Sequence, residues 1–162
     1  LHLLSRRQRQ MCIRDSYTRY RNSKIGIVFQ AYNLLPYLTP LENVLAAMEI
    51  TSNPIKNKKE RARELLTRMG ITEDQMKRNI NKLSGGEQQR VAIARAISTN
   101  AEVILADEPT GNLDVDTAAG IVKIFKELAH EDKKCVIAVT HSEAFAAEAD
   151  VVVRLEKKKL QD

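Results

Sequence analysis

The feature that most constrains this sequence is a set of short, nearly continuous apolar runs separated by longer helical patterns. The runs lie at 25–29, 103–106 and 135–139, with a fourth at 151–155. Continuous apolar runs of this length are typical of parallel strands covered on both faces. Helical segments at 87–98, 115–129 and 142–148 alternate with the later runs. This alternation predicts right-handed β–α–β units and an α/β fold.

The region 31–82 interrupts that alternation, because it contains no run that resembles a strand. Thr39 and Glu42 have the spacing of a capping box with Pro40 at the first helical position, which predicts a helix over 40–50. A second helical pattern covers 58–69 and stops at Gly70. We interpret 31–82 as a mainly helical subdomain inserted into the α/β domain.

Composition favours one soluble globular domain, since the chain has 162 residues with 43% hydrophobic and 29% charged content. No apolar run approaches the roughly 18–20 residues of a membrane helix, so a membrane role would depend on a partner. The net charge is +5, but residues 1–16 carry four arginines and one aspartate. The remaining charges are dispersed along helices, which does not favour nucleic-acid binding.

Two cysteines, Cys12 and Cys135, form neither a disulfide framework nor a metal-spaced pair, and a reducing cytoplasm suits them. We expect Cys135, within an apolar run, to be buried.

The segment 1–16 does not match the rest of the chain. Its leucines precede its arginines, which is the reverse of the order in a signal peptide. Residues 11–16 resemble the translated end of a transposon adapter used in sequencing libraries. We therefore interpret 1–16 as a non-native leader and 17–162 as a partial domain.

Polar residues with phosphate or metal chemistry follow three of the predicted strands. Gln30 follows the first, Asp107 and Glu108 the second, and Thr140 and His141 the third. The carboxyl ends of strands line the ligand crevice in open α/β sheets. Adjacent carboxylates repel each other unless a cation or proton is present, so we predict a magnesium ion there. Asp107 is expected to hold the ion and Glu108 to polarise the water that attacks a γ-phosphate.

The stretch LSGGEQQR at 83–90 is the most specific pattern in the chain. Ser84 and Glu87 have capping-box spacing, so the stretch could simply begin a helix. Gly85 and Gly86 suggest more, because each costs about 1 kcal/mol inside a helix. Bare backbone N–H groups at a helix N-terminus suit phosphate binding.

Together these motifs resemble those of the ATP-binding subunits of ABC transporters. LSGGEQQR is similar to the family signature, VILADEP at 103–109 to the Walker B strand, and GNLD at 111–114 to the D-loop. Gln30 corresponds to the Q-loop glutamine and His141 to the switch histidine. The stretches FQAYNLLPYLTPLENV and ADEPTGNLD are most similar to cassettes for lipoprotein release, macrolide export and antimicrobial-peptide resistance.

The resemblance implies a P-loop NTPase-like sheet and a head-to-tail homodimer around two ATP molecules with Mg²⁺. Catalytic roles would fall to Glu108, His141 and Gln30, and metal binding to Asp107 and Gln30. The signature residues would face the nucleotide of the other subunit, and Asp114 would link the two sites. These nucleotide-facing positions are Ser84, Gly85, Gly86, Gln88 and Asp114. The family also implies a transmembrane permease partner and a place on the cytoplasmic face of the membrane.

One departure from the family is large: the chain contains no G-x-x-x-x-G-K-[ST] sequence, so the Walker A loop and the N-terminal strands of the fold are missing. We therefore expect the chain as it stands to be inactive. Alternatives are a translation-factor or DNA-repair ATPase of the same superfamily, or a catalytically dead relic. The short spacing between Gln30 and Leu83 leaves no room for a long coiled coil, and Glu108 and His141 are both retained.

Overall fold

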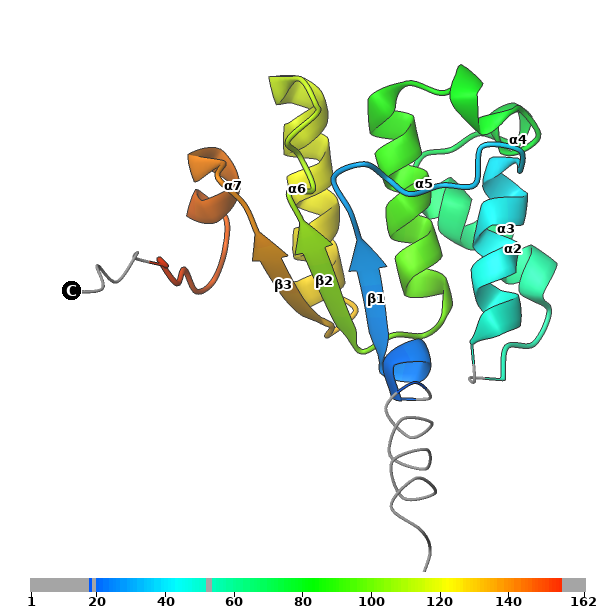
Figure 1. Ribbon diagram of the computed structural model, residues 1–162, viewed down its shortest axis with the longest axis horizontal. Helices are drawn as coiled ribbons and strands as arrows, with labels where there is room; N and C mark the ends of the chain where they lie inside the picture. Colours follow the sequence, from blue (N-terminus) through cyan, green and yellow to red (C-terminus); the bar gives the residue numbers. More distant parts are fainter. Residues whose placement is uncertain (1–17, 19, 52–53, 156–162) are drawn as a thin grey trace, which may run out of the picture.

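The computed structural model describes residues 18, 20–51 and 54–155, and within them the chain forms a three-stranded parallel sheet (Figure 1). The strands are β1 (Ile25–Val28), β2 (Val103–Asp107) and β3 (Cys135–Val139), in the order β1-β2-β3. Ile25 is paired with Val103, and Val103 with Cys135, so the three strands begin at the same level. The predicted α/β fold is confirmed, as are the first three strands.

Helical segments between β1 and β2 are α2 (Pro40–Ile50), α3 (Lys58–Arg68), α4 (Glu73–Met76), the 3₁₀ turn η1 (Ile80–Lys82) and α5 (Gly85–Ser98). The capping box predicted for α2 is present: Thr39 Oγ1 accepts from Glu42 N at 3.2 Å, and Thr39 N donates to Glu42 Oε2 at 2.8 Å. α3 ends at Arg68 and is followed by Gly70, whose φ of 76° lies in the left-handed region that glycine adopts readily. The predicted leader 1–16 lies outside the described residues.

The remaining helices are α6 (Val115–His130), which connects β2 to β3, and α7 (Glu143–Ala147), which follows β3. Phe125 of α6 and Phe145 of α7 meet edge to face with their ring centroids 5.9 Å apart. In the described part of the chain, no helix is both long enough and apolar enough to cross a membrane.

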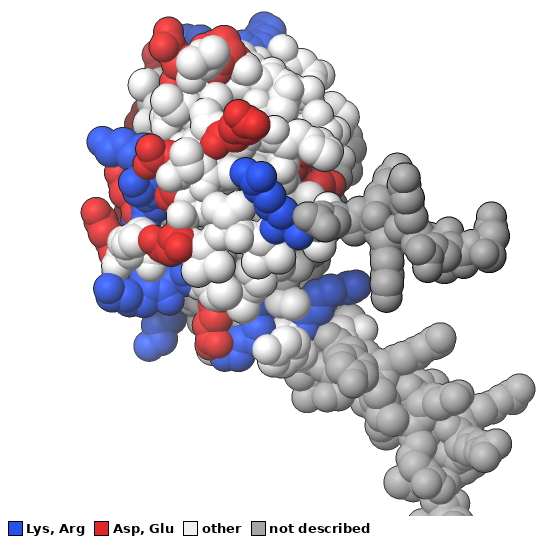
Figure 2. Space-filling model, turned by 90° about the vertical axis from the view of Figure 1, so that its left-hand side faces the viewer, with Lys and Arg blue, Asp and Glu red and all other residues white. Residues whose placement is uncertain are grey.

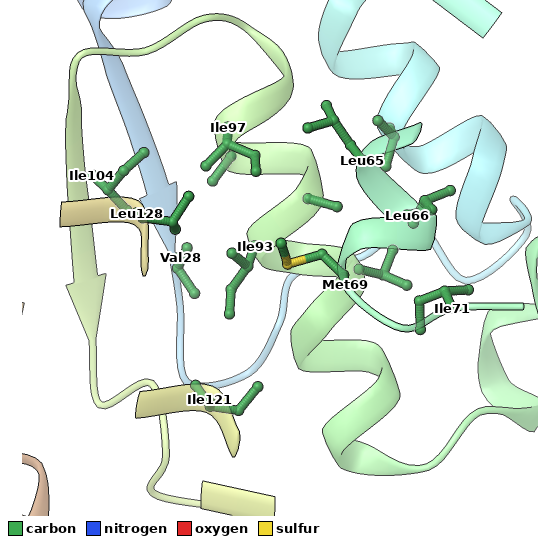
Figure 3. Close-up of a cluster of buried hydrophobic side chains, with 14 of the residues drawn as sticks. Val28, Leu65, Leu66, Met69, Ile71, Ile93, Ile97, Ile104, Ile121 and Leu128 are labelled. Carbon is green, nitrogen blue, oxygen red and sulfur yellow. The ribbon is translucent and has the colours of Figure 1, made fainter. Parts of the chain in front are cut away.

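Helix α5 forms the centre of the molecule, because it packs against β1 on one side and against α2 and α3 on the other. Its side chains Ile93 and Ile97 are buried among residues of both groups (Figure 3). The approach of β1 to α5 is so close that a Cβ atom at Gly26 would lie 2.4 Å from the carbonyl oxygen of Ala96. One core therefore joins the sheet to the helical segments.

Among the described residues, helices cover one face of the sheet and none covers the other, which corrects the prediction that both faces are covered. Val28, Ile104 and Ala106 point into the helical layer and are at most 3% exposed. On the other face Ile137 and Val139 are 52% and 60% exposed. Cys135 shares that face and is exposed, so the prediction of a buried cysteine is wrong. Figure 2 views the molecule from the side of α7 and β3, where charged residues are separated by broad white areas.

The fourth predicted strand, 151–155, does not form. This segment has no regular secondary structure, and Val151, Val153 and Leu155 are between 78% and 91% exposed. Figure 1 shows it running from α7 away from the sheet. An apolar run indicates a propensity for strand, but a strand also needs a neighbouring backbone to pair with. The described residues offer none beside this segment.

Candidate functional site

The carboxyl ends of the three strands bring most of the predicted site residues to one edge of the sheet. Glu108 and His141 come together there, with Glu108 Oε1 3.8 Å from His141 Nε2. Gln30 and Glu108 both lie close to Gly111, where a Cβ atom would be 2.9 Å from Gln30 Nε2 and 3.5 Å from Glu108 Cβ. Asp107 is exposed at the end of β2. The predicted gathering of amide, carboxylate and imidazole groups is thus observed in the geometry.

Glu108 has an unusual backbone, with φ of 43° at a residue that is not glycine. Its amide N donates to Val139 O at 2.9 Å, and its carbonyl O accepts from Gly111 N at 3.1 Å. The carboxylate accepts from Thr140 Oγ1 at 3.1 Å and from His141 N at 2.8 Å. Because the side chain is only 19% exposed, these two donors define its position. Strained backbone held by its surroundings is common at functional sites.

Gln30 is held by Asn112 through two contacts. Gln30 Nε2 donates to Asn112 Oδ1 at 3.3 Å, and Asn112 Nδ2 donates to the carbonyl oxygen of Gln30 at 3.2 Å. Sequence reasoning placed Asn112 in the stretch 111–114 but did not single it out. A signal was available, since an amide beside a glycine in a loop after a strand is a common partner for backbone groups.

The loop after Gln30 is fixed to α5 by Arg95. Its guanidinium donates to the carbonyl oxygens of Tyr32, at 2.9 Å, and Asn33. Both of those residues have positive φ, 60° and 48°. Burial lowers the pKa of Arg95 and raises that of the Tyr32 phenol. The Tyr32 hydroxyl lies over Gly85, where a Cβ atom would be 2.9 Å away.

The stretch 83–90 begins α5 through a capping box. Ser84 Oγ accepts from Glu87 N at 3.3 Å, and Ser84 N donates to Glu87 Oε2 at 2.7 Å. Gln88 Nε2 donates to Leu83 O at 2.9 Å, so this side chain also supports the turn. Ser84 itself is exposed. A serine hydroxyl that accepts one hydrogen bond still has a proton to donate.

Packing accounts for part of the glycine pair in this stretch. A Cβ atom at Gly86, which is buried, would lie 2.3 Å from Thr117 Cγ2 of α6. Gly85 meets Tyr32 less closely. The sequence predicts that both glycines favour phosphate binding. The structure shows in addition that Gly86 allows α5 to contact α6.

Asp114 and Gln89 make further hydrogen bonds around α5 and α6. Asp114 caps α6, its Oδ1 accepting from Thr117 N at 3.0 Å. Hydrogen bonds from the side chain and backbone of Thr117 lower the pKa of Asp114. Gln89 is fully buried on α5 and donates from Nε2 to Pro109 O at 2.7 Å, directly after Glu108. Sequence reasoning missed Gln89 because a glutamine in a helix carries no signal of burial.

The described residues contain no group of three or more His, Cys, Asp and Glu side chains arranged to hold a metal ion alone. Asp107 and Gln30 still fit Mg²⁺, because they offer carboxylate and amide oxygens at adjacent strand ends. Magnesium is usually held by one or two such protein oxygens together with substrate phosphates and water.

A cleft of about 1070 Å³ between α6 and α7 has Glu108 and His141 among its lining residues.

A parallel sheet with an acidic pair at one strand end and a glycine-rich helix start beside it defines a class of nucleotide-binding cassettes. The family model described as ABC transporter matches residues 5–111, which also includes much of the segment 1–16. The chain belongs to this family.

Two curated relatives place the chain more closely within the family. It is 52% identical over 140 residues to the "Uncharacterized ABC transporter ATP-binding protein YclH" of Bacillus subtilis, covering 86% of this chain and 62% of YclH. It is 42% identical to the "Lipoprotein-releasing system ATP-binding protein LolD 2" of Rhodopirellula baltica, covering 88% and 58%. The chain therefore spans about 60% of the length of these relatives.

The solved structure of MJ0796, described as a bacterial ABC transporter cassette, has the same fold. It matches with a TM-score of 0.74 and 42% identity over 84% of this chain and 60% of that one. That cassette was solved as a dimer, and also in a post-hydrolysis state bound to ADP and Pi. The predicted P-loop NTPase-like fold and the predicted family are both confirmed.

Proposed function

We propose that this protein is the ATP-binding subunit of a bacterial ABC transporter, in which ATP hydrolysis by a head-to-tail dimer drives export or membrane extraction by a permease. The observation that carries the proposal is the Glu108 carboxylate, held by Thr140 and His141 beside an exposed Asp107. A carboxylate fixed at the sheet edge, next to a second one that suits a cation, has the arrangement needed for phosphate hydrolysis.

Each residue of the edge has a separate part in the proposed reaction. Asp107 and Gln30 would hold Mg²⁺, which would neutralise charge on the ATP phosphates. Glu108 accepts a hydrogen bond from the attacking water and takes up its proton as the water oxygen bonds to the γ-phosphorus. The bond from that phosphorus to the β–γ bridging oxygen breaks, so that ADP and phosphate are the products. The ring of His141 is fully exposed, so it is available to contact the γ-phosphate.

The position of the glycine-rich helix start supports the proposed dimer. Ser84 is exposed at the N-terminus of α5, where the helix dipole and backbone N–H groups favour an anion. In the proposed dimer Ser84, Gly85, Gly86 and Gln88 face the nucleotide of the other subunit. Asp114, at the start of α6, lies in the segment that links the two sites. The dimer reported for the related MJ0796 cassette supports this assembly.

A permease partner is proposed from the family and from LolD 2, whose description is that of one component of a releasing system. The protein would act on the cytoplasmic side of the membrane and contact it through that permease. The sequence stretches shared with lipoprotein-release, macrolide-export and antimicrobial-peptide-resistance cassettes favour an export or extraction role.

Replacement of Glu108 by glutamine tests the proposal, because it keeps the shape of the side chain and removes the base. In a protein completed with the N-terminal part of a related cassette, we expect Glu108→Gln to slow ATP turnover about 100-fold or more. ATP binding should remain, and ATP-dependent dimers should accumulate in size-exclusion chromatography. Glu131→Gln, an exposed carboxylate at the end of α6, is the matched control. Turnover near that of the wild type in Glu108→Gln would remove Glu108 from the catalytic role.

A further inference from the structure

The register of β2 and β3 places Glu108 beside Thr140. Asp107 pairs with Val139 at the end of the sheet, and Glu108 N continues the ladder by donating to Val139 O at 2.9 Å. The next residues along the two strands are therefore Glu108 and Thr140. Their side chains meet through Thr140 Oγ1 and Glu108 Oε2, which are 3.1 Å apart.

The Thr140 hydroxyl takes part in a second hydrogen bond as well. Ser142 N donates to Thr140 Oγ1 at 3.0 Å, so the hydroxyl acts as an acceptor towards the turn. A hydroxyl has one proton to donate, and an ionised carboxylate can only accept. The Thr140 hydroxyl thus donates to the Glu108 carboxylate. This hydrogen bond restricts rotation of the hydroxyl group.

Both donors to the Glu108 carboxylate come from the turn after β3. His141 N supplies one and Thr140 Oγ1 the other. Only the second is a side-chain group that a substitution can remove. It acts on a carboxylate that is 19% exposed and whose backbone has φ of 43°. Removing one of the two hydrogen bonds to such a side chain frees its orientation more than the same change at an exposed residue does.

We propose that Thr140 is the positioning residue for the catalytic base, fixing the carboxylate of Glu108 through its hydroxyl so that the remaining lone pairs face the attacking water. This inference rests on the proposed function of Glu108. Thr140 contacts no reacting atom in it and acts only through the carboxylate. A general base works best when its geometry is set before the substrate arrives.

The simpler role for Thr140 is to form the turn into α7 by accepting from Ser142 N. Thr140→Val and Thr140→Ser separate the two roles only when Glu108 is varied as well. Valine has the shape of threonine without the hydroxyl, and serine keeps the hydroxyl without the methyl group. A role confined to the turn would make the effects of Thr140→Val and Glu108→Gln on turnover independent.

The first measurement is hydrogen exchange by NMR on the 162-residue chain without nucleotide. Thr140→Val is expected to raise the exchange rate of the His141 amide about 3- to 10-fold, because the carboxylate that accepts from it is no longer held. Thr140→Ser should stay within about 2-fold of the wild type, and the amide of Leu105 in β2 should not change. Thr140→Ala is measured beside the valine variant and should give the same local change. An unchanged His141 amide in both would overturn the proposal.

The second measurement is ATP turnover in the completed protein. Thr140→Val should lower kcat about 10-fold with KM for ATP within about 2-fold of the wild type, and Thr140→Ser should restore it. In the Glu108→Gln background the valine change should cause no further loss. A further loss there, or a serine variant as slow as the valine one, would overturn the proposal.

The two experiments also separate this inference from the proposed function. Slow Glu108→Gln with normal Thr140→Val rejects the role of Thr140 alone. Normal turnover in Glu108→Gln rejects the role of Glu108, and with it the inference that depends on it.

Discussion

At the scale of single residues, the two carboxylates of the acidic pair differ in surroundings because β2 ends between them. Asp107 is exposed, whereas Glu108 turns under the segment 140–141. Glu108 lies beyond the end of β2 and has φ of 43°, so the backbone leaves the strand conformation there and the two carboxylates take different surroundings. The sequence predicted that Asp107 would hold a cation and Glu108 would act on water. It did not predict the donors to Glu108, because these come from the turn after β3, 32 and 33 residues away along the chain.

Ser84 offers a test of the shared site at this same scale. Ser84→Arg is expected to leave the ATP affinity of the completed monomer within about 2-fold of the wild type while abolishing hydrolysis. The reason is that Ser84 faces the nucleotide of the other subunit in the proposed dimer. Equilibrium titration of the monomer and steady-state turnover give the two values.

Arginine also removes the cap on Glu87 N, which costs roughly 1 kcal/mol. Ser84→Asp is the matched control, because aspartate keeps an N-cap oxygen but places a negative charge where a phosphate is expected. It should retain the thermal stability of the wild type and still lose hydrolysis. If either variant abolishes ATP binding to the monomer, the shared-site arrangement is wrong.

At the scale of elements, close packing against neighbouring segments leaves no room for a side chain near the start of α5. Gly86 lies against Thr117 of α6, and Gln89 reaches Pro109 after β2. The glycine-rich helix start and the loop that carries Glu108 are therefore parts of one packed unit. Movement of either element would have to break a buried contact of the other.

Gly86→Ala is expected to destabilise the chain by about 1–3 kcal/mol, because the added Cβ would lie 2.3 Å from Thr117 Cγ2. Thr117→Ser removes that methyl group and keeps the hydroxyl, so it should recover most of the loss in the double variant. Urea denaturation of the four proteins measures the coupling. No recovery in the double variant would mean that the contact with Thr117 is not the cause.

Gly120→Ala provides the control within α6. Apart from the adjoining residues and backbone of its own helix, no atom of the described residues lies within 4 Å of a Cβ at this exposed position. Alanine should therefore stabilise the chain there by roughly 0.5–1 kcal/mol through helix propensity.

Elements whose sequence patterns lie within a few neighbouring residues were predictable from the sequence. The capping boxes at Thr39 and Ser84 and the apolar runs of β1, β2 and β3 are encoded within a few residues, and each forms as expected. The segment 151–155 was predicted wrongly because pairing depends on a neighbouring strand and not on its own residues. The exposed face of β3 was missed for the same reason: an apolar run does not say what covers it.

At the scale of the whole molecule, the fold brings the candidate site residues together at one edge of the sheet. The 162-residue sequence, however, does not contain the phosphate-binding motif of its family. Gln30, Glu108 and His141 lie at one edge in a chain that spans about 60% of its curated relatives. The G-x-x-x-x-G-K-[ST] sequence does not occur in it. In the proposed site, position and affinity are thus separate properties: the edge would orient a bound nucleotide, but it offers few groups that attract one.

We therefore expect the 162-residue chain to bind Mg-ATP only weakly and not to hydrolyse it. ATP carries several negative charges, which phosphate loops balance with backbone N–H groups, a helix dipole and a lysine. The sheet edge of this chain instead presents Asp107 and Glu108, which repel phosphate unless a magnesium ion lies between them. Magnesium itself is held jointly by the nucleotide and protein oxygens, so it adds little affinity when the phosphates are poorly held.

The measurement compares the chain with a completed version by Mg-ATP titration calorimetry and a phosphate-release assay. In the completed version, residues 1–16, which we propose are not native, are replaced by the N-terminal part of a related cassette that carries the phosphate loop. Asp107→Asn in the completed protein is the control for metal-dependent binding, and it should weaken binding in the presence of magnesium but not in its absence. Activity that appears only in the completed protein would support the assignment of affinity to the phosphate loop. A Kd in the micromolar range for the unmodified chain would overturn it, because the affinity would then come from the edge formed by Gln30, Asp107 and His141.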